Sequence, residues 1–167
     1  VIMSVVYKNI FECSLYLKNN GLVAFPTETV YGLGANALNN EAVSDIFKIK
    51  ERPKTDPIIV HIHDLNQIRD LVDISKDNFM VVKKLADNFW PGPLTLLLKA
   101  SKNIPSIVTA DTGLVGIRIP NNEMALKLLR ESNLPIAAPS ANKFEHISPT
   151  KSFHVEYDFK DNHCLDK

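Results

Sequence analysis

Hydrophobic positions along the chain follow two periodicities, and each predicts a different kind of element. Helical spacing of apolar side chains predicts helices over residues 9–18, 41–50, 78–89 and 123–131. Short apolar runs predict strands over residues 22–25, 58–62, 94–99, 115–119 and 136–138. Pro26 ends the first strand, and the hydroxyl and glycine residues at 27–34 predict a turn after it.

The order of these elements predicts the fold class. Because strands and helices interleave along the chain, the sequence indicates an α/β domain. Polar motifs follow the ends of strands, after Phe25, Ile62, Ile119 and Ala138. Open α/β sheets bind their ligands at such strand ends, so we expect the functional site there.

Composition and charge argue against several classes of binding partner for this chain. The chain has 167 residues, 45% of them hydrophobic, which suits one globular domain. Lys plus Arg and Asp plus Glu are equal at 19 each, so no overall field attracts nucleic acid or membrane. The chain has two cysteines, and they do not form a CxxC motif, so the sequence does not indicate a zinc site. The apolar start lacks a basic segment, and no apolar run approaches about 20 residues, so we expect a cytoplasmic protein.

Hydroxyl side chains gather after the first strand, in the sequence Phe-Pro-Thr-Glu-Thr-Val-Tyr-Gly-Leu-Gly. Thr27 and Thr29 are able to orient an amino acid or a carboxylate without adding charge. They are equally suited to capping the backbone of a turn, and local chemistry alone leaves both interpretations open.

Three cations lie close together at the end of the second predicted helix, in the sequence Lys-Glu-Arg-Pro-Lys. Lys50, Arg52 and Lys54 would suit a triphosphate, since arginine offers a rigid fork and lysine a point charge. The alternative is a helix C-terminus with favourable cations followed by a solvated loop. Flanking prolines favour the first interpretation, because they stiffen the loop.

Further polar residues lie at the ends of later strands. His61 would make a neutral polar contact at a strand edge. Arg118 lies within an apolar strand, where a charge is costly unless it is paired. Capturing an anionic ligand and pairing with Asp or Glu are both consistent with this position. Ser140, Asn142 and Ser148 would hold a nucleotide or serve as ordinary turn residues.

Together these motifs resemble the YrdC/YciO family of threonylcarbamoyl-AMP synthases. The matching stretches occur in family order and cover residues 25–34, 50–53 with 57–61, 90–96, 117–120, and 138–142 with 148–150. The resemblance implies an α/β domain with a YrdC-like, twisted, open mixed sheet, flanked by helices, around a concave positive cavity. We therefore expect a YrdC-like domain over residues 1–155 and a polar tail over residues 156–167.

The resemblance also implies a reaction. The family forms L-threonylcarbamoyl-adenylate from L-threonine, bicarbonate and ATP, and releases pyrophosphate. A separate tRNA transferase complex then uses the product to make N6-threonylcarbamoyladenosine. Mg²⁺ is expected to bridge the phosphates, and no residue is assigned as a metal ligand.

The family's site residues carry over to matching positions in this sequence. The catalytic cations are then Lys50 and Arg52. The ATP-binding residues are Lys50, Arg52, Lys54, Ser140, Asn142 and Ser148. The threonine-binding residues are Thr27, Thr29, His61 and Arg118.

The sequence departs from the family pattern near its end. The family continues with an Asp-Gly-rich turn and a Ser-Thr-Val strand, which this sequence does not contain. A truncated copy of the family, a fragment and a degenerate paralogue are all consistent with this departure. A non-catalytic domain that binds a nucleotide or RNA is the alternative.

Overall fold

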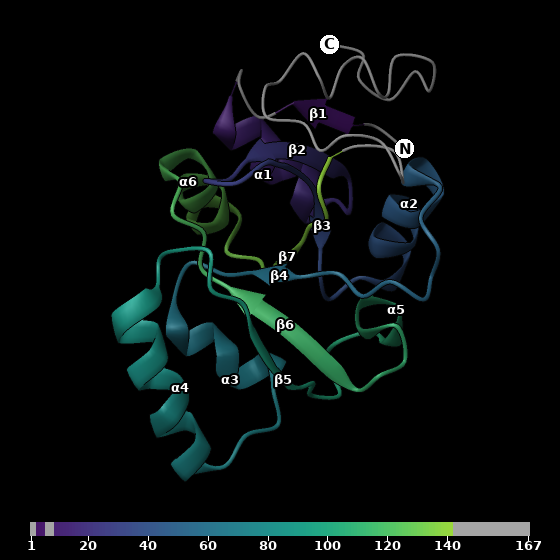
Figure 1. Cartoon of the computed structure of the whole chain (residues 1–167). Helices are drawn as coiled ribbons and strands as arrows, with labels where there is room; N and C mark the ends of the chain where they lie inside the picture. The colour runs from purple at the N-terminus through teal and green to yellow at the C-terminus, as the bar shows by residue number, and fades with distance from the viewer. Residues whose placement is uncertain (1–2, 6–8, 142–167) are drawn as a thin grey trace.

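Strands and helices alternate through the computed structural model, which describes residues 3–5 and 9–141 (Figure 1). The strands are β1 (Met3–Val5), β2 (Leu22–Pro26), β3 (Tyr31–Asn36), β4 (Val60–His61), β5 (Leu96–Lys99), β6 (Leu114–Arg118) and β7 (Ile136–Ala137). The helices are α1 (Ile10–Lys18), α2 (Asn40–Lys50), α3 (Ile68–Leu71), α4 (Lys76–Phe89), α5 (Ser106–Thr109) and α6 (Glu123–Ser132), and a 3-10 turn, η1 (Leu65–Gln67), precedes α3.

The described strands form one open sheet in the order β1-β2-β3-β7-β4-β6-β5. β1 pairs with β2 and β4 with β6 in parallel, whereas the other neighbouring pairs are antiparallel. The sheet is therefore mixed, as predicted. In the parallel pair, His61 of β4 lies opposite Arg118 of β6, which sets two polar side chains next to each other.

Helices cover the sheet on both sides, and alternate strand residues enter two separate cores. Leu22 and Ala24 of β2 pack in the core that includes α2, whereas Val23 and Phe25 pack in the core that includes α1 and α6. This division follows from the two-residue period of a strand. α1 and α6 lie side by side on their face of the sheet (Figure 1).

The prediction of a turn over residues 27–34 was wrong, because β3 begins at Tyr31 and pairs antiparallel with β2. Glycine is required in this strand for close packing rather than for a turn. A Cβ atom on Gly34 would lie 2.7 Å from Cε1 of Phe25 and 2.7 Å from Cγ2 of Ile136. The turn is thus confined to the residues between β2 and β3.

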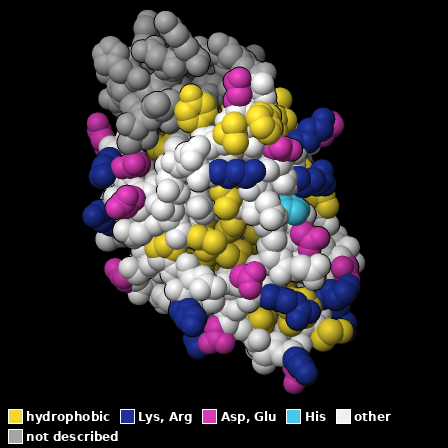
Figure 2. All heavy atoms as spheres, turned by 180° about the vertical axis from the view of Figure 1, so that it is seen from behind, with side chains coloured by type: hydrophobic (Ala, Val, Ile, Leu, Met, Phe, Trp, Pro, Cys, Tyr) yellow, Lys and Arg dark blue, Asp and Glu magenta, His cyan; other side chains and the backbone are white. Residues whose placement is uncertain are grey.

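The other predicted elements differ mainly in length. The central strand expected over residues 58–62 is only β4, and the expected helix over residues 78–89 starts two residues earlier. No helix among residues 3–5 and 9–141 has the length and apolar character needed to cross a membrane. Acidic and basic side chains are interspersed on the face seen from behind, around a central apolar area (Figure 2).

Candidate active site

A cavity of about 300 Å³ lies where the turn after β2, the loop after α2 and the ends of β4, β6 and β7 converge. Six of the predicted site residues line it: Thr27, Thr29, Arg52, His61, Arg118 and Ser140. They come from five separate segments of the sequence. The fold therefore brings the hydroxyl-bearing turn and the Arg52 guanidinium to one cavity rather than to opposite surfaces.

The turn between β2 and β3 is organised by the hydroxyl of Thr27. This hydroxyl donates a hydrogen bond to the Val30 carbonyl at 2.7 Å and accepts the backbone N–H groups of Thr29 and Val30 at 3.3 and 3.2 Å. The two threonine hydroxyl oxygens lie 3.0 Å apart. The capping interpretation of Thr27 is therefore correct, and the same bonds hold the Thr29 hydroxyl at the cavity.

Arg52 reaches the cavity because α2 ends abruptly before it. Glu51 adopts a left-handed conformation (φ 55°) and closes the helix, so the chain turns away at Arg52. The Arg52 guanidinium donates to the carbonyl of Pro57 at 3.0 Å and to the carbonyl of Asp56 at 3.4 Å. These bonds tie the cation to its own proline-containing loop and fix its position on the cavity wall.

His61 and Arg118 form the polar floor of the cavity from adjacent parallel strands. Burial, together with the nearby Arg118 guanidinium, lowers the pKa of His61 to about 4, so its imidazole is neutral at neutral pH. The ring packs edge-on against Phe25, with centroids 5.9 Å apart. Among the described residues, His61 Nδ1 has no hydrogen-bond partner.

Arg118 pairs with an acidic residue that the sequence analysis did not assign. Its Nη2 lies 2.6 Å from Oε1 of Glu28, and the arginine side chain is only 8% exposed. The contact is an ion pair rather than a well-directed hydrogen bond, since neither Nε nor Nη2 finds a directed acceptor within residues 3–5 and 9–141. Arg118 thus has a charge partner and also lines the cavity. The sequence contains no local signal for this pair, because the partners are 90 positions apart.

The other two predicted cations lie away from the cavity lining. Lys50 is 1% exposed, and its ammonium donates to the carbonyl of Ser140 at 2.5 Å, behind the cavity wall. Lys54 is exposed on the loop and is not part of the lining. Asn142 and Ser148 lie outside the described residues. Of the predicted triphosphate cations, Arg52 alone is in the lining.

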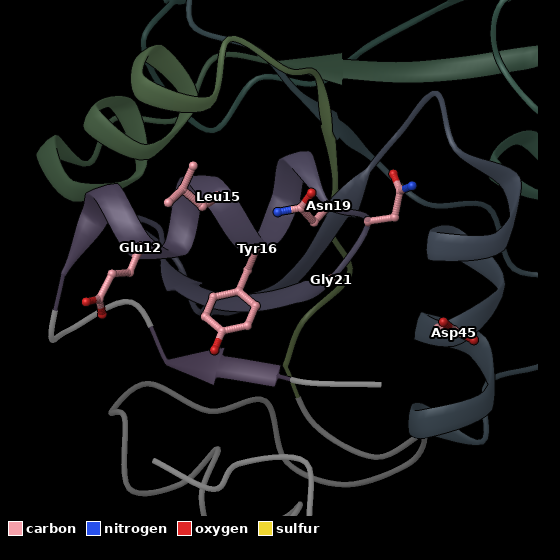
Figure 3. Close-up of a pocket in the computed structure, with 7 residues that line it drawn as sticks. Glu12, Leu15, Tyr16, Asn19, Gly21 and Asp45 are labelled. Atoms are coloured by element: carbon pink, nitrogen blue, oxygen red, sulfur yellow. The ribbon is translucent and has the colours of Figure 1, made fainter.

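A larger hollow of about 610 Å³ lies between α1, the turn that follows it, and α2 (Figure 3). It is lined by Glu12, Leu15, Tyr16, Asn19, Asn20, Gly21 and Asp45. Its charged lining residues are therefore acidic, and none of the predicted site residues is among them. An anionic substrate would be repelled there, so the smaller cavity is the better candidate for the active site. No group of three or more metal-binding side chains occurs within the described part of the chain.

Comparisons with known proteins show the family of this chain. A family model named Sua5_yciO_yrdC, described as "Telomere recombination", matches residues 15–166. A relative from Bacillus subtilis named threonylcarbamoyl-AMP synthase is 49% identical over 150 residues, covering 89% of this chain and 42% of the relative. A Pyrococcus abyssi relative with the same name is 48% identical, covering 86% of this chain and 42% of its own length. The chain thus spans less than half the length of these relatives.

Solved structures show the same fold. The crystal structure of Pyrococcus abyssi Sua5 complexed with L-threonine superposes with a TM-score of 0.89 at 42% identity, covering 99% of this chain and 49% of that one. Escherichia coli YciO, at 20% identity, gives a TM-score of 0.74 and covers 99% of this chain and 80% of its own; it shows the fold alone. The predicted α/β class and the YrdC-like sheet are confirmed.

Proposed function

Because the chain belongs to the Sua5/YciO/YrdC family, we propose that it forms L-threonylcarbamoyl-adenylate from L-threonine, bicarbonate and ATP. One observation carries this proposal: Arg52 and the Thr27–Thr29 turn line the same cavity as His61 and Arg118. Relatives named threonylcarbamoyl-AMP synthase and the threonine complex of Pyrococcus abyssi Sua5 support it.

The threonine half of the reaction uses the floor of the cavity and the turn. Arg118 offers its guanidinium to the threonine carboxylate, and a charge-assisted bond of this kind is among the stronger polar contacts. His61 is neutral, so its orphaned Nδ1 is able to take part in a hydrogen bond without adding charge. Thr29 supplies a hydroxyl at the cavity wall, beside the turn that Thr27 organises.

We assign the nucleotide half to Arg52 and the loop after α2. The threonine amine and bicarbonate condense to a carbamate with loss of water. A carbamate oxygen then attacks the α-phosphorus of ATP, and the bond from this phosphorus to the bridging oxygen breaks as pyrophosphate leaves. Two anions must meet, and a fixed cation such as Arg52 reduces their repulsion. The other ATP contacts that we propose come from Lys54, Asn142 and Ser148. Lys50 would contribute its positive charge from behind Ser140. Holding both reactants in one cavity supplies much of the remaining rate enhancement.

We expect Mg²⁺ to enter this site only when it is bound to the phosphates of ATP. The cavity lining contains Arg52, His61 and Arg118 and no carboxylate, so the described lining offers no charged oxygen ligand for a hard cation. When bound, Mg²⁺ would neutralise phosphate charge and would be held by phosphate oxygens and water.

The product's use and its location remain predictions. A tRNA threonylcarbamoyl transferase complex would consume the adenylate in the cytoplasm. The synthase names of the relatives favour catalysis over a non-catalytic, RNA-binding domain.

Pyrophosphate release tests the proposal directly. We expect release only when L-threonine, bicarbonate and ATP are all present. Thr29→Val removes one cavity hydroxyl and should raise the KM for threonine. Thr55→Val, a matched change on an exposed loop residue outside the cavity lining, should leave the rate unchanged. Folded protein that releases no pyrophosphate with all three substrates would reject the proposed activity.

A further inference from the structure

Glu28 connects two walls of the cavity, although it is not itself among the lining residues. Its Oε1 lies 2.6 Å from Nη2 of Arg118, and its Oε2 accepts the backbone N–H of Asn121 at 3.1 Å. Both oxygens of one carboxylate are therefore engaged, one at the end of β6 and the other in the segment before α6. The Glu28 side chain is one-fifth exposed, so water competes only partly for these contacts.

The contact between Glu28 and Arg118 also affects the cavity, because Glu28 lies between two residues that line it. Thr27 and Thr29 flank it, and the Thr27 hydroxyl holds the turn rigid through bonds to Thr29 and Val30. A carboxylate fixed on such a turn also fixes the turn relative to Arg118. Glu28 therefore links the hydroxyl side of the cavity directly to the guanidinium side.

We propose that Glu28 is a positioning residue, which holds the Arg118 guanidinium in the orientation that receives the threonine carboxylate. The proposal rests on the proposed function, since it takes threonine as the ligand. Arg118 is almost fully buried, and an unpaired buried cation would be costly, so Glu28 also compensates its charge. Because the Asn121 N–H anchors the second oxygen, Glu28 remains in place when the ligand arrives.

A competing role for Glu28 makes the opposite prediction. If Glu28 merely occupied Arg118 until a ligand displaced it, then removing its negative charge would free the cation and tighten threonine binding. A positioning role predicts weaker binding, because a loose arginine must be ordered before it can make a directed contact. The sign of the change in affinity therefore separates the two roles.

The test compares two ligands in calorimetric titrations of the full chain and its Glu28→Gln variant. The amide of glutamine has a single acceptor oxygen, so either Arg118 or the Asn121 N–H loses its partner. We expect Glu28→Gln to weaken L-threonine binding by roughly tenfold or more, in line with a lost charge-assisted contact. L-threoninamide, which lacks the carboxylate, should bind the variant and the wild type alike.

A matched control separates this effect from the loss of any ion pair. Asp73→Asn makes the same carboxylate-to-amide change in the exposed pair with Lys99. Neither partner lines the cavity, so both affinities should be unchanged. Thermal melting establishes that Glu28→Gln is folded at the titration temperature. If it is not, Glu28→Asp, which is too short to reach both partners, replaces it with the same expectation.

Each possible result of these titrations either supports or overturns the positioning role of Glu28. Threonine binding that is unchanged or tighter in the variant would overturn the positioning role. An equal loss for threonine and threoninamide would also overturn it, because a general structural defect does not discriminate between them. Wild-type protein that does not bind threonine at all would instead reject the proposed function, and the role of Glu28 would be rejected with it.

Discussion

His61 makes the stability of the fold depend on pH, and the size of the effect follows from its burial. In the unfolded chain its pKa returns to the ordinary value of 6.5, whereas in the fold it is about 4. Between these values the unfolded chain binds a proton that the folded chain does not. The free energy of unfolding therefore falls as the pH is lowered through this window. At about 1.4 kcal/mol per pKa unit, the loss is about 3 kcal/mol.

Chemical denaturation at a series of pH values from above 6.5 down to 4 measures this loss. The variant His61→Gln has no imidazole to protonate, so the difference in unfolding free energy between it and the wild type should shrink by about 3 kcal/mol across the window. If His61→Gln loses stability with falling pH as steeply as the wild type, then His61 is not a buried neutral imidazole and the described floor of the cavity is wrong.

Three further substitutions test other parts of the account. Gly34→Ala places a Cβ atom 2.7 Å from Phe25 and should lower the unfolding free energy by about 1–3 kcal/mol in denaturant titrations; wild-type stability would contradict the packing of β3 on β2. Arg52→Lys keeps the charge but loses the fork that bonds two loop carbonyls, so calorimetry should show weaker ATP binding and unchanged threonine binding; equal losses for both ligands would argue against its assignment to the nucleotide. Lys50→Met leaves the Ser140 carbonyl without its ammonium donor and should cost about 1–3 kcal/mol in thermal or chemical unfolding; an unaffected variant would show that the bond does not support the cavity wall.

Local patterns predicted most of the helices, because their signals lie within a single element. α2 shows this clearly: Asn39 caps its start by accepting the Ala42 N–H, and Lys48 and Lys50 lie in its last turn. The same reasoning failed at residues 27–34, where glycines normally indicate a turn. Gly34 is required by Phe25 and Ile136, side chains that meet only after the sheet has formed. A requirement imposed by tertiary packing has no local signature.

In the candidate site too, local motifs predicted some features, whereas others depend on tertiary contacts. Thr27, Thr29 and Arg118 were predicted from motifs, and the fold brings them to one cavity. The sequence is consistent with either an acidic partner or a ligand for Arg118, and in the fold this residue both pairs with Glu28 and lines the cavity. The assignment of Lys50 to the triphosphate stays a prediction. Its ammonium donates to the Ser140 carbonyl, a contact between distant segments that no local pattern indicates. Contacts between distant segments decide such details.

We expect the cavity between the Thr27–Thr29 turn and Arg118 to receive threonine. A crystal structure of this chain with L-threonine would show where the amino acid binds. We predict electron density for the amino acid in this cavity, with its carboxylate within hydrogen-bonding distance of the Arg118 guanidinium. Threonine bound in the hollow between α1 and α2, with the cavity left to water, would contradict the account.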